Sequence, residues 1–420
     1  MQKDNTKKNI WILSELYYPE QTSTGYLLTK IAEGLAANYA VKVITGPATN
    51  FFNSEDCLRE EIVNGVEIFR CKGSNLDKNI VTGRLINLVT RSTAILLNSF
   101  FKCEKRDYIL VVTNPPTLTF VALLVSFVKD CQFITLVHDV YPDVLVTTGL
   151  LQSHSPVVKI WNIFNQTIYK NSTAIITLGR DMSKIIRKKL AEGDANKVYC
   201  IPNWAETDIV KANNKNHNTL LKELDICQKF VILYAGNMGR THGVEDLARA
   251  AERLREYKDI HFVFLGFGKK KIWLEQYVDG KNIDNVSILP PRPRSEQVIF
   301  LNACDLAVVS FIPDMAGISV PSRMYNHMAA GKPIIAVADD WSELAEVIRE
   351  EEIGWIVKPG DLESLVKTIK FASTHPQLCA EMGRRAANVA QSKYTFARVE
   401  QMYKKLFREL FAQENEELSF

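Results

Sequence analysis

The stretch from Val308 to Val337, VVSFIPDMAGISVPSRMYNHMAAGKPIIAV, places a polar turn between two hydrophobic segments. Its two β-branched runs, Val308 to Ile312 and Ile334 to Val337, predict short strands. Between them, residues 322–330 predict a helix that ends at Gly331, the residue type that most often terminates helices. A strand, a loop, a helix and a second strand in this order are typical of an α/β fold.

The start of this helix is the first candidate for a binding site. Pro321 precedes it, and the main-chain N–H groups of Ser322, Arg323 and Met324 would lie at the positive end of the helix dipole. Arg323 adds a cation whose planar guanidinium suits phosphate. The pattern therefore predicts a site for a diphosphate. The alternative is an ordinary crossover with a surface arginine.

Strands and helices alternate along most of the chain, which predicts two doubly wound parallel sheets in tandem. The first series comprises strands at 10–13, 41–45, 66–70, 108–113, 133–137, 174–178 and 198–201 and helices at 25–38, 84–102 and 118–129. The second comprises strands at 230–234, 260–265, 286–289, 306–311 and 334–337 and helices at 244–257, 270–278 and 295–303. The polar, Asn-rich segment 205–229 between them is the linker candidate.

Periodicity alone also allows a periplasmic-binding-protein-like or a dehydrogenase-like pair of domains. The dehydrogenase is the weaker choice, because no G-x-G-x-x-G follows the first strand. The lone G-x-G of Gly266 and Gly268 stands late in the chain, where a tight turn is the simpler interpretation.

Composition narrows the classes of function. The chain has 420 residues, of which 46% are hydrophobic and 24% charged, enough for two globular domains. A net charge of +3 argues against a dedicated nucleic-acid binder. Eight cysteines without a C-x-x-C pair predict neither a zinc site nor a disulfide framework, which fits a reducing cytosol. Neither a secretion signal nor an apolar run of ~20 residues is found, so a cytoplasmic protein, soluble or peripheral on the membrane, is expected.

Segments that match a known family are spread over nearly the whole chain in the expected order. They are residues 14–19, 22–26, 137–142, 234–239 and 243–244, the turn Pro321-Ser322-Arg323, and Met328-Ala329-Ala330-Gly331-Lys332-Pro333. Together these segments resemble glycosyltransferase family 4, whose members retain the anomeric configuration. The resemblance is to the subgroup that acts on lipid-linked oligosaccharides in bacterial surface polysaccharide synthesis.

This resemblance implies the GT-B architecture, an α/β fold of two Rossmann-like, doubly wound domains that face a central cleft. The expected boundaries are an N-terminal, acceptor-side domain at 1–204, the linker at 205–229 and a nucleotide-sugar-binding domain at 230–393. Residues 394–420 are left as a C-terminal helix that could cross back to the N-terminal domain.

The resemblance also assigns a set of donor-binding residues at the carboxyl ends of predicted strands, where open α/β sheets bind ligands. They are Thr24, Gly25, Gly236, Asn237, Arg240, His242, Gly317, Ser322, Arg323, Met324, Tyr325 and Asn326. The hydroxyls around Thr24 can also cap the helix that follows, so a plain helix start is the alternative there.

Several of these positions depart from the family. Thr24 stands where the family has the first glycine of a pair, and Asn237 and His242 stand where it has Arg and Lys. Both glutamates of its Glu-x(7)-Glu pattern are missing: Ile318 and Asn326 occupy their places. We expect Arg240 and Arg323 to neutralise the diphosphate instead, and the Asn326 amide to bind the ribose hydroxyls.

His138 and Asp139 follow the predicted strand 133–137 and are the candidate catalytic residues. A family histidine at this place contacts the donor hexose near the reaction centre, a role that the resemblance transfers to His138. Asp139 is a neighbour that can instead bind the acceptor. A structural histidine is the alternative.

The segment from Arg84 to Lys102 predicts an unusual helix. Its polar residues Arg84, Asn87, Arg91, Asn98 and Lys102 form one narrow stripe at helical spacing, without an acid, and apolar side chains fill the rest. This pattern is typical of an interfacial helix on an anionic membrane. The alternative is a helix buried within its domain, with the stripe in water.

The preferred hypothesis is a retaining glycosyltransferase on the cytoplasmic face of the membrane. It would move a sugar from a nucleotide-diphosphate donor, a UDP-sugar, to a polyprenyl-diphosphate-linked saccharide, with no cofactor and no metal. Asp339-Asp340 does not form the Asp-x-Asp pattern of a metal site. A sugar-nucleotide epimerase of the same fold and a non-catalytic partner subunit stay open as alternatives.

Overall fold

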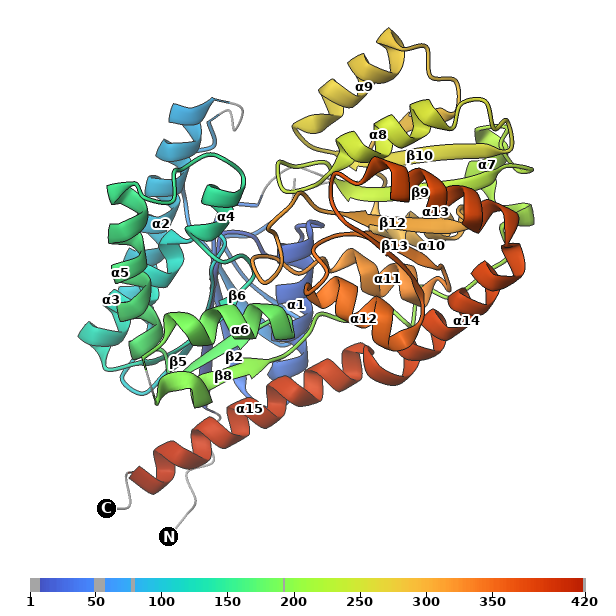
Figure 1. The fold of residues 1–420 in the computed structure, drawn as a ribbon. Coiled ribbons are helices and arrows are strands. Elements are labelled where there is room, and N and C mark those ends of the chain that lie inside the picture. The colour runs from blue at the N-terminus through green and yellow to red at the C-terminus, as the bar shows by residue number, and fades with distance from the viewer. Residues whose placement is uncertain (1–7, 49–56, 77–79, 192, 418–420) are drawn as a thin grey trace. The chain divides into compact units, whose positions relative to one another are not determined.

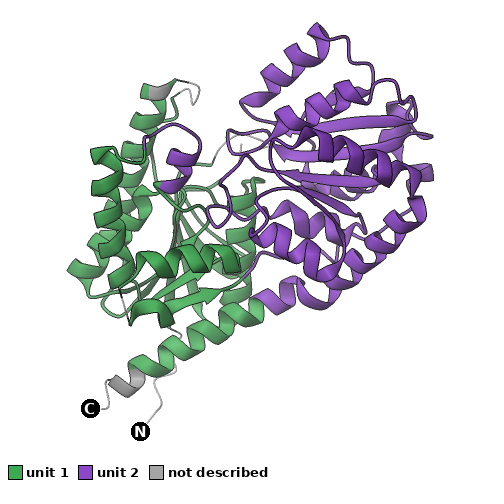
Figure 2. Ribbon diagram, in the orientation of Figure 1, with its two compact units in different colours: residues 1–142, 153–201, 400–420 green, residues 143–152, 202–399 purple. Residues whose placement is uncertain are grey.

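The computed structural model describes residues 8–48, 57–76, 80–191 and 193–417. The chain divides into two compact units (Figure 2). Residues 1–142, 153–201 and 400–420 form unit 1, and residues 143–152 and 202–399 form unit 2. Each unit has helices on a twisted sheet (Figure 1). The predicted pair of Rossmann-like domains is confirmed, whereas the cleft between them stays a prediction.

Unit 1 contains an eight-stranded sheet in the order β3-β4-β2-β1-β5-β6-β7-β8. All neighbours are parallel except β3 and β4, which form an antiparallel hairpin at one edge. The strands are β1 (Asn9–Ser14), β2 (Ala40–Thr45), β3 (Glu60–Val63), β4 (Val66–Arg70), β5 (Tyr108–Val112), β6 (Gln132–Val137), β7 (Ala174–Thr177) and β8 (Val198–Cys200). The central strand β5 is buried along its whole length, because helices cover both faces of a parallel sheet.

The helices of unit 1 alternate with its strands. They are α1 (Ser23–Ala36), α2 (Val81–Lys102), α3 (Thr117–Lys129), α5 (Pro156–Asn171), α6 (Arg180–Lys189) and η1 (Asp194–Lys197). The C-terminal helix α15 (Phe396–Glu417) joins them from residue 400 onward. Phe411 of α15 packs edge-on against Tyr108 with ring centroids 4.6 Å apart, so the end of the chain is part of this domain's core.

Unit 2 contains a six-stranded parallel sheet in the order β11-β10-β9-β12-β13-β14. Its strands are β9 (Phe230–Asn237), β10 (Ile260–Phe267), β11 (Val286–Leu289), β12 (Leu306–Ser310), β13 (Ile334–Val337) and β14 (Gly354–Val357). The chain starts in the middle, builds outward to β11 and then returns to β12 on the other side. This reversal of strand order is the place where doubly wound sheets bind ligands.

The helices of unit 2 include the helix that the sequence predicts at residues 322–330. They are α4 (Asp143–Thr147), η2 (Lys215–His217), α7 (Thr219–Glu223), α8 (Val244–Arg253), α9 (Lys270–Gly280), η3 (Arg294–Glu296), α10 (Gln297–Asn302), α11 (Arg323–Ala329), α12 (Glu343–Glu351), α13 (Leu362–Thr374) and α14 (Pro376–Lys393). Residues 205–229, predicted as a linker, hold η2 and α7 and belong to unit 2.

Helix α2 buries part of its polar stripe. Asn87 is 4% exposed, and its amide accepts from the Leu76 N–H at 2.9 Å and donates to the Leu76 carbonyl at 2.8 Å. Arg91 is 2% exposed; it pairs with Glu15 and donates to the Ser74 carbonyl at 3.1 Å. These two side chains therefore hold the segment after β4. The expectation that Arg91 faces a membrane is wrong, because its charge is already compensated inside unit 1.

The apolar side of α2 points away from the core. Leu85, Val89 and Phe101 are 55%, 61% and 80% exposed, and Leu88 and Leu96 are half-buried. The alternative in which this side is sealed inside the domain and the polar stripe faces water is therefore excluded.

His327, in α11, is a buried polar side chain without a partner. It is 0% exposed, and neither ring nitrogen has a hydrogen-bond partner among the described residues. Burial, together with the nearby charges of Arg323 and Lys332, lowers its pKa to about 3. The ring is therefore neutral in the folded protein at neutral pH, and its desolvated nitrogens destabilise unit 2.

We expect His327→Leu to raise the free energy of unfolding by about 1–3 kcal/mol at pH 7, because it removes an unsatisfied buried polar group. Below the unfolded pKa of about 6.5, the unfolded chain binds a proton that the folded chain does not, so the wild type loses stability as pH falls toward 3. The variant should lose less. Urea unfolding at pH 7 and pH 5 measures both effects, and a variant less stable than the wild type at both would contradict the prediction.

Candidate functional site

Unit 2 brings several predicted residues together at the carboxyl ends of β9, β10 and β12. Residues 238–243 follow β9, residues 268–269 follow β10, and residues 311–322 follow β12 and lead into α11. These three loops meet at the reversal of strand order, between β9 and β12. The predicted donor-binding segments of the second half therefore share one edge of one sheet.

Three glycines let the ends of β9 and β10 pack backbone to backbone. A Cβ on Gly266 would lie 2.0 Å from the Gly236 carbonyl oxygen, and one on Gly268 would lie 2.5 Å from that of Met238. Gly236 itself has φ of +136°, a conformation that side chains disfavour. The late G-x-G thus supports the loop after β9. The tight turn predicted for it is wrong, because Gly266 and Phe267 are the last residues of β10 and pair with β9.

Arg323 lies over this loop and is held from several sides. A Cβ on Gly236 would approach its Cζ to 3.0 Å, so only glycine leaves the guanidinium its space. The guanidinium lies 5.1 Å from the centre of the Tyr234 ring. Its Nη2 is 2.7 Å from His242 Nε2. Because arginine can only donate, His242 must accept through Nε2 and carry its proton on Nδ1, 3.2 Å from the Thr241 hydroxyl.

His242 is buried and uncharged. Burial first, and then the charges of Arg323 and Lys270, hold its pKa well below the usual value. Its ring stacks on Phe311 with centroids 5.4 Å apart. His242 stands where the family has a lysine that neutralises the diphosphate. A neutral imidazole cannot supply that positive charge. Its role in this structure is to fix the direction of Arg323.

Lys270 supplies a second cation that the sequence did not single out. Its ammonium donates to the His242 carbonyl at 2.7 Å and to Glu245 at 2.9 Å. Its side chain is 19% exposed, so it remains accessible at the edge of the loop. The nearest signal in the sequence is its position two residues after Gly268, at the start of α9. Arg323, His242, Lys270 and Glu245 are called the Arg323 cluster below.

The remaining predicted donor-binding residues of unit 2 differ in how exposed their side chains are. Asn237 and Arg240 are exposed on the loop after β9, and Ser322 is half-buried before α11. Met324 and Tyr325 are both 0% exposed, so their side chains belong to the core and only main-chain atoms could reach a ligand. Gly317 is buried in the loop after β12, with φ of +72°.

Asn326 is partly committed to the fold. Its side-chain oxygen accepts a hydrogen bond of 2.9 Å from the Glu206 N–H. Its amide nitrogen is the part left for a ribose hydroxyl. Ile318, at the other missing-glutamate position, is 6% exposed and apolar, so no charge replaces that glutamate.

In unit 1, Gly25 lies in the first turn of α1 and is buried. A Cβ there would lie 2.9 Å from Glu20 Cβ, so glycine is required by packing within the loop after β1. Thr24 is half-buried beside it. Thr22 is the N-cap residue, but its side chain makes no capping hydrogen bond, contrary to the expected use of these hydroxyls.

His138 and Asp139 lie at the carboxyl end of β6, as predicted, and Thr113 braces them. The Thr113 hydroxyl accepts from the His138 N–H at 3.1 Å and donates to the Asp139 carbonyl at 2.9 Å. Burial lowers the pKa of His138 to about 4. The imidazole is therefore neutral at neutral pH and can accept a proton or a hydrogen bond.

Among the described residues, no helix combines the length and the apolar character that a membrane crossing requires.

Comparison with known proteins gives a consistent class. Residues 217–389 match the family model described as Glycosyl transferases group 1. The probable glycosyltransferase WbjE of Pseudomonas aeruginosa is 27% identical over 360 residues, covering 86% of this chain and 88% of WbjE. The putative colanic acid biosynthesis glycosyl transferase WcaI of Escherichia coli K12 is 26% identical over 383 residues, covering 86% and 91%.

Solved structures show the same fold. Sucrose-phosphate synthase from Thermosynechococcus elongatus superposes with a TM-score of 0.76 at 15% identity, over 97% of this chain and all of that one. Anabaena HepE in complex with UDP and glucose gives 0.72, also at 15% identity, over 96% and 100%. The chain is thus a glycosyltransferase with the GT-B fold, and its residues 217–389 match the glycosyl transferases group 1 model.

Proposed function

We propose that this glycosyltransferase moves a sugar from a UDP-sugar to a polyprenyl-diphosphate-linked saccharide, with retention of configuration, in the synthesis of a surface polysaccharide. The observation that carries the donor assignment is the Arg323 cluster at the carboxyl edge of the unit 2 sheet. The names of WbjE and WcaI, and the UDP bound by HepE, agree with it.

The Arg323 cluster suits a diphosphate leaving group. When the bond from the sugar to the diphosphate breaks, negative charge grows on the leaving oxygens, and cations fixed in advance stabilise it. Arg323 is fixed by His242 at 2.7 Å. Lys270 lies against the same residue at 2.7 Å, but Glu245 at 2.9 Å compensates its charge, so Lys270 contributes as a hydrogen-bond donor. Arg240, which is exposed on the loop after β9, can add a second charge when donor binds.

His138 is the proposed contact at the reacting sugar. Its neutral ring can bond a sugar hydroxyl, and its position is fixed through the main chain by Thr113 at 3.1 Å. Asp139, one residue on, is the proposed contact for the acceptor. No step in this scheme uses a cofactor or a metal, and we expect transfer to continue in the presence of EDTA.

The function is tested by incubating the purified chain with a panel of UDP- and other nucleotide-sugars and a polyprenyl-diphosphate-linked acceptor. NMR of the product then gives the anomeric configuration. Transfer with inversion, or from non-uridine donors alone, would overturn the corresponding part of the proposal. Epimerised donor would favour the epimerase, and no turnover of any donor would favour a non-catalytic subunit that lacks both family glutamates.

We expect His138→Ala to lower kcat by at least about 100-fold, the usual contribution of a positioned acid–base or polar group at the reacting centre. The Kd for UDP should stay within about twofold, because UDP lacks the sugar that His138 contacts. Steady-state kinetics and calorimetry separate the two quantities. Equal losses in kcat and UDP affinity would make His138 a binding or structural residue instead.

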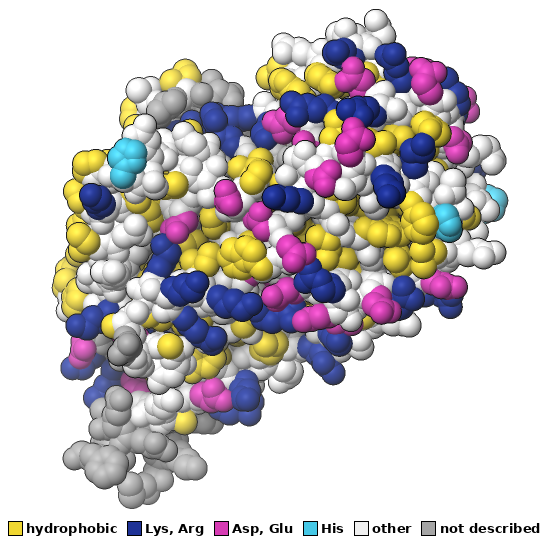
Figure 3. All heavy atoms as spheres, viewed as in Figure 1, with side chains coloured by type: hydrophobic (Ala, Val, Ile, Leu, Met, Phe, Trp, Pro, Cys, Tyr) yellow, Lys and Arg dark blue, Asp and Glu magenta, His cyan; other side chains and the backbone are white. Residues whose placement is uncertain are grey.

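We also propose that the protein is cytoplasmic and peripheral on an anionic membrane, where such an acceptor resides. The proposed surface is the apolar face of α2, α3 and α5, which pack side by side along unit 1 (Figure 1). Hydrophobic side chains follow this edge of the molecule (Figure 3). The exposed ones are Leu85, Ile86, Val89, Leu97, Phe100 and Phe101 of α2, Leu124, Phe127 and Val128 of α3, and Val157, Ile160, Ile163 and Phe164 of α5.

The helices that carry this apolar face contribute charges of one sign. Helices α2, α3 and α5 contain no Asp or Glu, whereas Arg84, Lys102, Lys129, Lys159 and Lys170 lie on them. Two acids adjoin the helix ends: Glu60 lies 3.5 Å from the Lys102 ammonium, and Asp130 follows α3. An apolar surface whose helices carry cations and no acid favours an anionic lipid bilayer, in which the apolar side chains enter the acyl region and the cations meet headgroups. The eight cysteines, all free thiols, fit a reducing compartment.

A further inference from the structure

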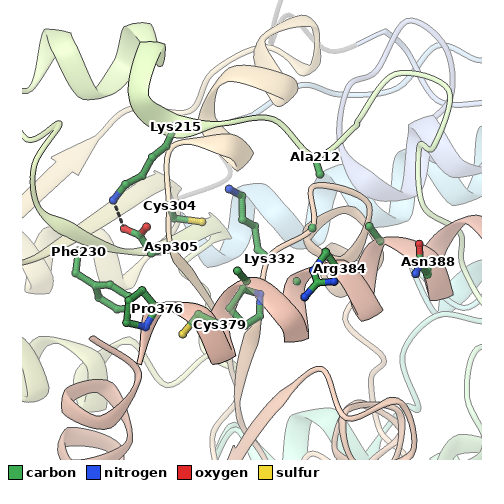
Figure 4. Close-up of a pocket in the computed structure, with 15 residues that line it drawn as sticks. Ala212, Lys215, Phe230, Cys304, Asp305, Lys332, Pro376, Cys379, Arg384 and Asn388 are labelled. Atoms are coloured by element: carbon green, nitrogen blue, oxygen red, sulfur yellow. Dashed lines mark hydrogen bonds and ion pairs between the residues drawn. The ribbon is translucent and has the colours of Figure 1, made fainter. Parts of the chain in front are cut away.

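A hollow lies in unit 2 at the amino ends of the strands, the edge opposite the Arg323 cluster. It has a volume of about 460 Å³ and lies where Phe230 starts β9, Asp305 precedes β12 and Lys332 precedes β13 (Figure 4). Helix α14 forms its other wall, with Pro376, Cys379 and Arg384. The hollow is large enough for a small metabolite.

Lys332 is the unusual residue of this hollow. It is only 8% exposed, yet its ammonium has a single long contact, 3.5 Å to the Asn302 carbonyl. An ammonium carries three N–H donors, and a buried charge without a counter-charge is costly. Within the described residues, Lys332 forms no ion pair. The side chain lines the hollow, so a ligand there can supply the missing acceptors.

The acid in the hollow does not fill this role. Asp305 accepts from the Lys215 ammonium at 2.5 Å and from the Val231 N–H at 2.8 Å, so its oxygens are engaged elsewhere. Lys215 in turn also donates to the Lys229 carbonyl at 2.8 Å. Asp305 and Lys215 therefore cancel each other.

The two thiols that line the hollow are uncharged, whereas the arginine of the lining, Arg384, carries a positive charge. Burial raises the pKa of Cys304 to about 12 and that of Cys379 to about 11. Arg384 lies exposed on α14 and, within the described residues, pairs with no acid. Lys332 and Arg384 are thus two cations without a partner on one concave surface, so the net charge there is +2.

We propose that this hollow binds the phosphoryl group of a small phosphate monoester. A dianionic phosphate matches the two uncompensated cations and offers acceptors for the ammonium and for the planar guanidinium. The apolar part of the lining, including Phe230, Pro333, Pro376 and the two thiols, suits the carbon part of such a metabolite. The site is separate from the proposed donor site and does not rest on it, since the two lie at opposite ends of the same strands.

The test is isothermal titration calorimetry with the full chain, using inorganic phosphate and glycerol 3-phosphate as probes at constant ionic strength. UDP is present in excess, so that phosphate cannot report on the Arg323 cluster. We expect both probes to bind, and Arg384→Gln and Lys332→Gln each to weaken binding at least 10-fold. Arg385→Gln is the matched control: it removes the same charge from the next position of α14, where the arginine donates to the Glu352 carbonyl at 2.8 Å.

Absence of phosphate binding in the wild type would overturn the proposal, and so would binding that both Gln variants leave unchanged. Arg384 is exposed, so its variant should fold and decides the matter even if Lys332→Gln does not. If UDP itself fails to bind, the proposed donor site is wrong, and the same titration repeated in Arg323→Ala still decides this one.

Discussion

Replacing Arg323 by alanine is expected to weaken UDP binding by about 10- to 150-fold. The guanidinium is held against the loop after β9 by His242 at 2.7 Å and over the Tyr234 ring at 5.1 Å, so it would lose little freedom on binding the proposed diphosphate. A hydrogen bond to a charged group contributes about 1.5–3 kcal/mol, which converts to this range in Kd. Calorimetry with UDP measures it directly, and transfer from the donor should fall at least as much.

Arg253→Ala is the control for this variant. Arg253 lies on α8 of the same unit, is 53% exposed and pairs with the exposed Glu363, so its removal changes the charge of unit 2 without touching the Arg323 cluster. Lys270→Met should reproduce part of the Arg323 effect. If UDP affinity is the same in Arg323→Ala, Lys270→Met and the wild type, the diphosphate is not bound at this edge of the sheet.

The strands that the sequence predicted best are those that are buried on both faces. Tyr108–Val112 and Ile334–Val337 are buried throughout, so they appear as uninterrupted apolar runs. β13 has the predicted bounds, and so does β11 (Val286–Leu289), which is a half-buried edge strand and not a central one. Central strands of parallel sheets depend on burial, and burial is what hydrophobic patterns report.

The strands that the sequence analysis missed lie at the sheet edges. β3 (Glu60–Val63) was missed because it is an exposed edge strand with two acids and has no apolar run. The Asn64-Gly65 turn after it, with φ of 49° and 81°, is a strong hairpin signal that could have revealed it. β14 (Gly354–Val357) begins with a glycine because a Cβ there would lie 1.8 Å from the Ile334 carbonyl oxygen. Such backbone contacts have little effect on the strand propensity of the sequence, so propensity does not reveal them.

The candidate site was predictable only in part. Arg323 could be predicted from the sequence, because the loop, the start of the helix and the arginine are adjacent in the chain and form a local pattern. Lys270 could not, since it stands in the run Lys269-Lys270-Lys271, which looks like a solvated surface. Its contact with the His242 carbonyl depends on β10 and β9 ending together, which is a tertiary fact.

Helix α2 shows the same limit in another form. The sequence identified its stripe correctly but not the direction in which it points. Asn87 and Arg91 turn inward because the segment after β4 has main-chain groups to satisfy, at 2.8–2.9 Å to Leu76 and 3.1 Å to Ser74. An unpaired main-chain group in the interior would be costly, so these polar side chains are buried and the apolar ones are left outside.

The apolar side chains of α2 that face outward lead to the second prediction. The double variant L85D F101D should lose binding to vesicles that contain an anionic phospholipid. Burying one such side chain in an apolar phase contributes about 1.5–3 kcal/mol, so losing two should lower the partition coefficient at least about 100-fold. Both side chains are more than half exposed, at 55% and 80%, so the change should leave the fold intact.

Four comparisons make this vesicle experiment decisive. Ile272→Asp is the matched control, because Ile272 is 64% exposed on α9 of unit 2 and its change should leave vesicle binding unaltered. Arg84→Gln should weaken binding modestly, by about 1 kcal/mol, and wild-type binding should fall as salt screens the headgroups. The double variant should still bind UDP as the wild type does, because the proposed donor site lies in the other unit. If the wild type fails to sediment with anionic vesicles at low salt, or the double variant binds as well as the wild type, the apolar face of α2, α3 and α5 serves some other contact, and the enzyme must reach its acceptor without it.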